Sequence, residues 1–234
     1  AQPADTPPTQ RMLVLPASAQ FALKQPGRAR DTLVKLVGLA PRMVDVRREL
    51  AGIEVQAGEY EAARNLIKEG MRATPRVYQL YLDYALIDLK ASGLPAALTT
   101  ADRLLNGDLG FLELTALKGD LYMAAQKPED AANAYAESAR TAPSAELTQR
   151  IAAAYMRAGK VDEARARLAA WMMNHPDDLA ALALTSELDI ASGELDEAEG
   201  ELKVILAKQP RNAVALNNLA RVYQLRGDPQ ARAT

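Results

Sequence analysis

The chain has 234 residues and a net charge of −2; 49% of its residues are hydrophobic and 25% are charged. It contains no cysteine, which excludes disulfide bonds, zinc–thiolate sites and thiol nucleophiles. The two charge signs are interleaved, unlike the clustered basic charge of nucleic-acid-binding domains, and no apolar run approaches the ~18 residues of a transmembrane helix.

Residues 1–13 are polar and rich in proline, which predicts a flexible lead-in. The start "AQPA" is what many signal-peptide cleavages leave behind, and other cuts in a chain would leave the same start. A cysteine-free chain suits the periplasm and the cytoplasm equally. Both locations therefore remain open at this point.

From residue 14 onward the sequence repeats with a period of 33 or 34. Prolines mark the period at Pro41, Pro75, Pro143, Pro176 and Pro210. Gly58, Gly159 and Gly193 each lie 17 residues before one of these prolines. In chain order this predicts repeats at approximately 14–41, 42–75, 76–109, 110–143, 144–176 and 177–210, with a partial repeat at 211–234.

Local chemistry predicts two helices in each repeat. The glycine supplies the left-handed residue that ends a first helix, and acidic residues after it favour the start of a second helix. The proline cannot continue that second helix. Small residues recur where two helices must approach closely, at Ala51, Ala85, Gly119, Ala152, Ser186 and Ala220 in first helices and at Ala63, Ala97, Ala131, Ala164 and Ala198 in second helices. One helix pair cannot bury its apolar face alone, so the pairs must stack.

The segment "IAAAYMRAGKVDEARARLAAWMMNHP" (Ile151 to Pro176) resembles the tetratricopeptide repeat (TPR) family, with its small residue, aromatic residue, glycine, alanine and proline at fixed places. The resemblance implies an all-α, right-handed α-solenoid of antiparallel helix pairs, with about six repeats plus one extra helix. It also implies a concave groove lined by the first helices, where a protein or peptide partner binds. Its polar groove residues would be Asp45, Arg48, Gln56, Gln79, Lys90, Glu113, Asp120, Glu146, Gln149, Arg157, Glu187, Asn217, Arg221 and Gln224.

Two repeats depart from this pattern. The first has Pro16 within its first helix and Pro26-Gly27 in its turn, and the third has "NGDLG" (Asn106 to Gly110) in place of its final proline. The segment at 106–110 is either an ordinary turn or a looser joint between the halves 1–106 and 110–234. The lysine and asparagine clamp of chaperone-tail-binding members is not matched, since only Asn217 and Asn218 resemble it.

Nothing in the sequence points to catalysis, to a cofactor or to a metal. His175 is the only histidine, and no nucleophile elbow or phosphate-binding glycine loop is present. The segment "WMMNHPDD" (Trp171 to Asp178) invites a metal interpretation, but its proline is the repeat-ending one and its aspartates stand where a helix cap belongs. The series Tyr78, Tyr81 and Tyr84 is interpreted as packing between repeats, with a stacking strip as the alternative. Arginines of the first third suit solvated helix faces or an anion-binding patch; they are Arg28, Arg30, Arg47, Arg48 and Arg76.

Two functions remain open, both of them non-catalytic. The segment "NNLARVYQLRGDPQARA" (Asn217 to Ala233) is similar to the last repeats of TPR lipoproteins of bacterial exopolysaccharide export, although Arg221 stands where they often have tryptophan. The "GxxDEA" turns also resemble those of cellulose-export subunits. This hypothesis places the chain in the bacterial envelope, in the periplasm, with export proteins or the polymer as partner. The alternative is a peptide-binding adaptor for pilus assembly, secretion or a cytoplasmic complex. The chain stops inside a second helix, which predicts a fragment whose C-terminal edge forms a homo-oligomer contact.

Overall fold

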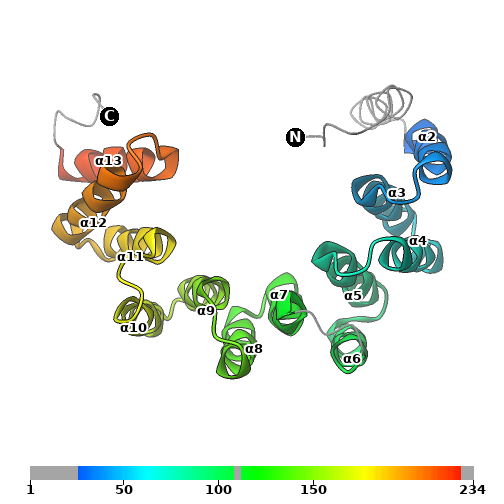
Figure 1. Ribbon diagram of the computed structural model, residues 1–234, viewed down its shortest axis with the longest axis horizontal. Coiled ribbons are helices and arrows are strands. Elements are labelled where there is room, and N and C mark those ends of the chain that lie inside the picture. The colour runs from blue at the N-terminus through cyan, green and yellow to red at the C-terminus, as the bar shows by residue number, and fades with distance from the viewer. Residues whose placement is uncertain (1–25, 108–111, 228–234) are drawn as a thin grey trace. The chain divides into compact units, whose positions relative to one another are not determined.

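The structure is a computed structural model that describes residues 26–107 and 112–227. In these ranges the chain forms twelve α-helices and one 3-10 helix, without any β-strand, and divides into two compact units, Ala1–Ala125 and Gln126–Thr234 (Figure 1). The predicted lead-in at 1–13, the residue Pro16 and the terminal segment 228–234 lie outside the described residues. So does most of the "NGDLG" segment.

The helices follow one another in short, turn-linked succession. The first unit contains α2 (Pro26–Leu39), α3 (Val44–Gln56), α4 (Tyr60–Ala73), α5 (Tyr78–Ser92), α6 (Leu94–Leu105), η1 (Leu112–Ala116) and α7 (Leu117–Ala124). The second unit contains α8 (Pro128–Thr141), α9 (Ala145–Arg157), α10 (Val161–Met172), α11 (Leu179–Ser192), α12 (Leu195–Lys208) and α13 (Ala213–Arg226). The boundary between the units falls between the two predicted helices of the repeat at 110–143.

Each unit is a stack of helix pairs. Within the units α3, α5, α9 and α11 pack on the helix that follows them, and they also contact the first helix of the next pair, α5, α7, α11 and α13 respectively. This neighbour-only pattern defines an α-solenoid. The predicted all-α fold of stacked helix pairs is therefore confirmed.

Glycine ends the first helices as the sequence predicts. Gly58, Gly159 and Gly193 adopt φ angles of 83°, 74° and 81°, a left-handed conformation that costs glycine little. Gln126 fills the same slot in the repeat at 110–143 and is held at a φ of 59°. A side chain at this φ is strained, so one turn of the solenoid is built from a residue that does not suit it.

Small residues allow the close approach of the helices. In the second helices the five recurring alanines are fully buried; they are Ala63, Ala97, Ala131, Ala164 and Ala198. The first-helix series is buried from Ala51 to Ser186, while Ala220 is only half-buried. Ala220 lies in α13, the last described helix, so no described helix follows to cover it.

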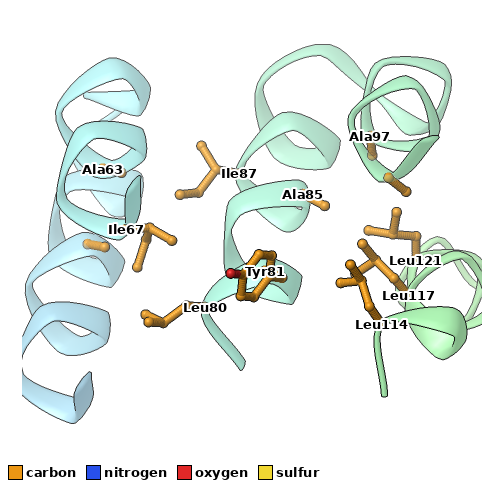
Figure 2. Packing of buried hydrophobic residues seen from close by; sticks show 12 residues of the cluster. Ala63, Ile67, Leu80, Tyr81, Ala85, Ile87, Ala97, Leu114, Leu117 and Leu121 are labelled. Atoms are coloured by element: carbon orange, nitrogen blue, oxygen red, sulfur yellow. The ribbon is translucent and has the colours of Figure 1, made fainter. Parts of the chain in front are cut away.

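The core of the first unit centres on α5. Tyr81 is fully buried, and Tyr78 and Tyr84 are partly buried beside the same cluster. Figure 2 shows α5 between Ile67 of α4 and the leucines of η1 and α7. The tyrosine series therefore serves packing, as interpreted from the sequence, although the most deeply buried ring is that of Tyr81.

An ion pair with a buried carboxylate recurs at three joints between helix pairs, and the sequence reasoning missed it. An arginine in a second helix, or in α2, contacts a carboxylate 24 residues later: Arg30 with Glu54 at 2.8 Å, Arg165 with Asp189 at 2.5 Å, and Arg64 with Asp88. The carboxylate side chains are 5%, 2% and 6% exposed, respectively. Each pair ties one helix pair to the next.

Candidate functional site

The second unit has a hollow of about 620 Å³ on its first helices, which we call the α9–α13 groove. Three first helices and the second helix α12 supply its walls. The lining residues are Glu146, Gln149, Arg150, Ala153, Leu179, Ala180, Ala183, Leu184, Leu202, Ile205, Gln209, Asn212, Val214, Ala215 and Asn218. These side chains share one side because first helices align in a stack, with residues three and four apart on one helix face.

Apolar side chains form most of the groove surface. Leu179 and Leu184 of α11 are half-buried, and Val214 lies at the start of α13 with 57% of its surface exposed, whereas Leu202 and Ile205 of α12 are buried beneath this surface. Large apolar surface that remains open to solvent in a concave site is a mark of a binding surface. The groove therefore offers burial to an apolar partner.

The polar part of the groove is almost neutral. Its two charged residues, Glu146 and Arg150, form an ion pair on α9 at 2.8 Å. The other polar groups are amides, and Asn212 is already engaged as the cap of α13, accepting from the backbone of Ala215 at 3.0 Å. The groove therefore does not select a partner by net charge.

Asn218 is the groove residue whose side-chain donor lacks a hydrogen-bond acceptor in the described part of the chain. Its Nδ2 atom is buried and finds no acceptor among the described residues. A buried amide donor without a partner costs roughly 1–3 kcal/mol of desolvation.

A smaller hollow of about 200 Å³ lies in the first unit, between α3, α4 and α5. Arg48 and Asp83 face each other at this site, with Nε to Oδ2 at 2.5 Å and the second guanidinium nitrogen to Oδ1 at 3.3 Å. The hydrogen bond to Asp83 raises the pKa of Arg48 above its usual range. Arg48 is therefore satisfied within the chain and is not an open anion-binding group.

The predicted partner-binding residues of the first unit are dispersed. Asp120 of α7 accepts a hydrogen bond from the Tyr78 hydroxyl at 2.5 Å, and Arg48 is paired as described. The remaining five are exposed at helix starts or ends or on helix surfaces, away from the small hollow: Asp45, Gln56, Gln79, Lys90 and Glu113.

In the second unit the α9–α13 groove brings two predicted residues together, Glu146 and Gln149. Arg157 lies at the end of α9 and donates to the Gln126 side chain at 3.4 Å. Glu187 is half-buried in α11 and lies outside the groove lining, and so do three exposed residues of α13, Asn217, Arg221 and Gln224.

The groove residues that the sequence did not single out are Arg150, Gln209, Asn212, Asn218 and the apolar lining. Asn218 was considered only with Asn217 as a weak match to a clamp, and α13 presents Asn218 to the groove. Only the polar residues at the groove-facing positions of the repeat were predicted from the sequence, so the apolar wall was missed. A search for apolar residues on first helices beyond those needed for the core would have found Leu184 and Val214.

The arginines of the first third are mostly committed to the fold. Arg47 is 4% exposed and donates to the Pro41 carbonyl at 2.9 Å and to Glu69 at 3.1 Å. Arg30 is paired with Glu54. These contacts leave no basic patch in which Arg30, Arg47 and Arg48 act together.

The segment "WMMNHPDD" forms a joint between α10 and α11. The Trp171 and His175 rings stack with centroids 3.7 Å apart, and Trp171 Nε1 donates to Asp178 at 2.8 Å. Asp178 caps α11 by accepting from the backbone of Ala180 and Ala181. Trp171, His175 and Asp178 therefore have partners within the chain, which explain the joint without a ligand.

Within 26–107 and 112–227, no three histidine, aspartate or glutamate side chains gather closely enough to hold a metal ion. The same ranges contain no helix long and apolar enough to cross a membrane.

Comparison with known proteins identifies the fold. No protein-family model and no curated protein matches the chain. A tetratricopeptide repeat protein from Parabacteroides merdae superposes with a TM-score of 0.54 at 14% identity, over 96% of this chain and 89% of that one. The chain thus has the fold of TPR proteins, as the repeat pattern implied.

Two further TPR structures are more distant. YrrB, described as a TPR protein with an unusual peptide-binding site, gives a TM-score of 0.46 at 14% identity, over 79% of this chain and 95% of that one. TTC0263, a TPR protein from Thermus thermophilus, gives 0.42 at 18% identity, over 74% and 94%. Likeness at this level supports no argument about function.

Proposed function

We propose that the chain is a non-catalytic scaffold that binds a peptide segment of a protein partner in the α9–α13 groove. The observation that carries the proposal is the composition of the groove: an apolar wall, a neutral amide rim and the Nδ2 donor of Asn218, which lacks an acceptor among the described residues. Apolar side chains of a peptide would bury against Leu184 and Val214, which keep exposed surface in the groove. The Nδ2 atom of Asn218 is buried as it stands, so a rotation of this side chain toward the groove would let it donate to a main-chain carbonyl, which every residue of a peptide carries.

The same composition argues against the polymer itself as the occupant of the groove. No aromatic side chain lines it. Sugar rings commonly stack on the flat apolar face of an aromatic side chain. Tyrosine and tryptophan add a polar group that can form a hydrogen bond. A protein partner therefore fits this groove better than a polysaccharide does.

We further propose a bacterial exopolysaccharide synthesis or export assembly in the periplasm as the setting. The resemblance of residues 217–233 to export lipoproteins supports this setting. A peptide-binding adaptor for pilus assembly, secretion or a cytoplasmic complex is the second candidate, supported by the generic character of the groove. Immunoblots of fractions from the source cells separate the export setting from a cytoplasmic adaptor, because a purely cytoplasmic signal would contradict the export setting.

Peptide selection followed by affinity measurement tests the binding proposal. Peptides selected on the full chain from a random display library should be rich in aliphatic side chains. Val214→Glu places a charge at the mouth of the groove and should weaken their binding at least tenfold. Val204→Glu is the matched control, because Val204 is a similarly exposed valine, 48% exposed, outside the groove lining.

Two results would sink the binding proposal. One is equal affinity of the wild-type chain and Val214→Glu for the selected peptides. The other is binding of a soluble β-linked glucose oligosaccharide that displaces them. Circular dichroism of both variants confirms that the helices are intact before affinities are compared.

A further inference from the structure

The joint between α10, α11 and α12 has a carboxyl group, that of Glu201, where its counterpart in the first unit has a hydroxyl group. The first unit has Arg64, Asp88 and Thr100 at this place, and the second has Arg165, Asp189 and Glu201, with the same spacings of 24 and 12 residues. Thr100 donates its hydroxyl hydrogen to Asp88 at 2.5 Å. Glu201 thus stands where the first unit uses a neutral hydrogen-bond donor.

Positive charge at the joint is too small to pair every carboxylate. Arg165 contacts Asp189 at 2.5 Å and Glu194 at 2.8 Å, and Asp189 is 2% exposed. The Oε2 atom of Glu201 is buried and has no hydrogen-bond partner among the described residues. An ionised Glu201 would leave one guanidinium facing three carboxylates.

The surrounding groups hold the proton on Glu201. Burial raises the pKa of Glu201 to about 8, and the negative charge of Asp189, a hydrogen bond to it and the charge of Glu197 act in the same direction, while Arg165 opposes them. On the other side of α12, the ionisable groups of α13 that reach it, Tyr223 and Arg226, contact Glu199.

We propose that the α11–α12 joint is a pH-sensitive element, in which protonated Glu201 serves as the neutral donor to Asp189 and loss of that proton loosens the helix pair. The same pair supports the groove: Leu184 of α11 is half-buried in its lining, and Leu202 of α12, the neighbour of Glu201, is buried beneath it. Deprotonation would therefore act on the wall of the groove. The inference concerns the joint alone and does not rest on the proposed function.

The sign follows from proton binding. The folded joint keeps a proton that the opened joint releases above the ordinary value of 4.5. Opening therefore becomes more favourable as pH rises from about 4.5 to about 8, by at most about tenfold for each pH unit, and changes no further above that range. Partial exposure of the Glu201 side chain reduces the factor below this limit.

Carboxyl-carbon NMR of the full chain, with glutamate labelled, tests the proton on Glu201 directly. The Glu201 carboxyl resonance, assigned in the wild-type chain by through-bond correlation with its own backbone amide, should titrate above pH 7. Amide hydrogen exchange, corrected for the intrinsic pH dependence, should show protection of α12 falling several-fold for each unit from pH 5.5 to 7.5. Glu201→Gln keeps a neutral donor and should remove that fall. Glu197→Gln, at an exposed residue of the same helix, should retain most of it.

A Glu201 midpoint below pH 5.5 would overturn the proposal, whatever the behaviour of the variants. The same conclusion follows if wild-type chain and Glu201→Gln lose protection in parallel. The carboxyl titration uses the wild-type chain, so a failure of the variant to fold does not leave the question open.

Discussion

Leu168→Ala tests the packing between the repeats of the second unit. Leu168 is fully buried in a cluster with Ala152, Ala164, Ala181 and Leu188. Three of these four neighbours are alanines, whose side chains cannot extend into the space that a truncated leucine leaves. Buried leucine-to-alanine changes cost about 2–5 kcal/mol, with the larger values where the site cannot collapse, so we expect about 4 kcal/mol here.

Urea unfolding followed by tryptophan fluorescence measures this loss. Trp171 is the only tryptophan in the chain and lies one helical turn after Leu168, at the edge of the same cluster. With an m-value of about 2 kcal/mol/M, the midpoint should fall by about 2 M. Met173→Ala is the control, because Met173 is 84% exposed, and it should change the free energy of unfolding by less than about 0.5 kcal/mol. A loss below about 1.5 kcal/mol for Leu168→Ala would refute the packing argument.

The remaining predictions concern a helix-interior glycine, two turns and a buried carboxylate. Urea unfolding followed by circular dichroism measures each of them. Gly200→Ala should stabilise by about 0.5–1 kcal/mol, because Gly200 lies inside α12 and nothing stands within 4 Å of the added carbon. Gly193→Ala should instead destabilise by about 1–2 kcal/mol, because Gly193 has a φ of 81°; equal effects of the two changes would contradict both. Gln126→Gly should stabilise by up to about 1 kcal/mol by relieving a φ of 59°, and a loss of stability would show that this turn is not strained. Thr100→Val should cost about 1–3 kcal/mol, because Asp88 loses its hydroxyl donor, whereas Thr100→Ser should cost much less.

The repeat architecture could be predicted from the sequence because the period adds up weak local signals. A single proline or glycine says little, but Pro176 and Gly159 gain meaning from partners one period away. The ends of α9 and α11 followed from this register. The 3-10 helix Leu112–Ala116, which precedes α7, could not be predicted, because nothing in that segment breaks the apolar spacing.

The ion pairs of the buried carboxylates could not be predicted from the sequence for a different reason. Glu54, Asp88 and Asp189 lie near the ends of first helices, where a carboxylate is usually solvated. Their burial depends on an arginine of the preceding helix that is 24 residues away in the chain, a spacing that no helical or strand period predicts. Only the stacking of helix pairs brings the two charges together.

The groove was predictable as a face but not as a set of residues. The TPR register places first helices on one side, and Glu146 and Gln149 do line the groove. Which polar group lacks a hydrogen-bond partner depends on contacts inside the fold. Arg150 pairs with Glu146, Asn212 caps a helix, and the buried Nδ2 donor of Asn218 has no partner among the described residues. Such pairing appears only once the side chains are placed.

The most direct test of the account is a map of where a bound peptide contacts the chain. The isotope-labelled 234-residue chain should be titrated with a peptide selected on it, and the amide and side-chain shifts followed by NMR. The account predicts that the largest changes fall on Gln149, Leu184 and the Asn218 side-chain amide. Changes concentrated on the first unit, or on Asn217 and Arg221 with the groove residues unmoved, would contradict it.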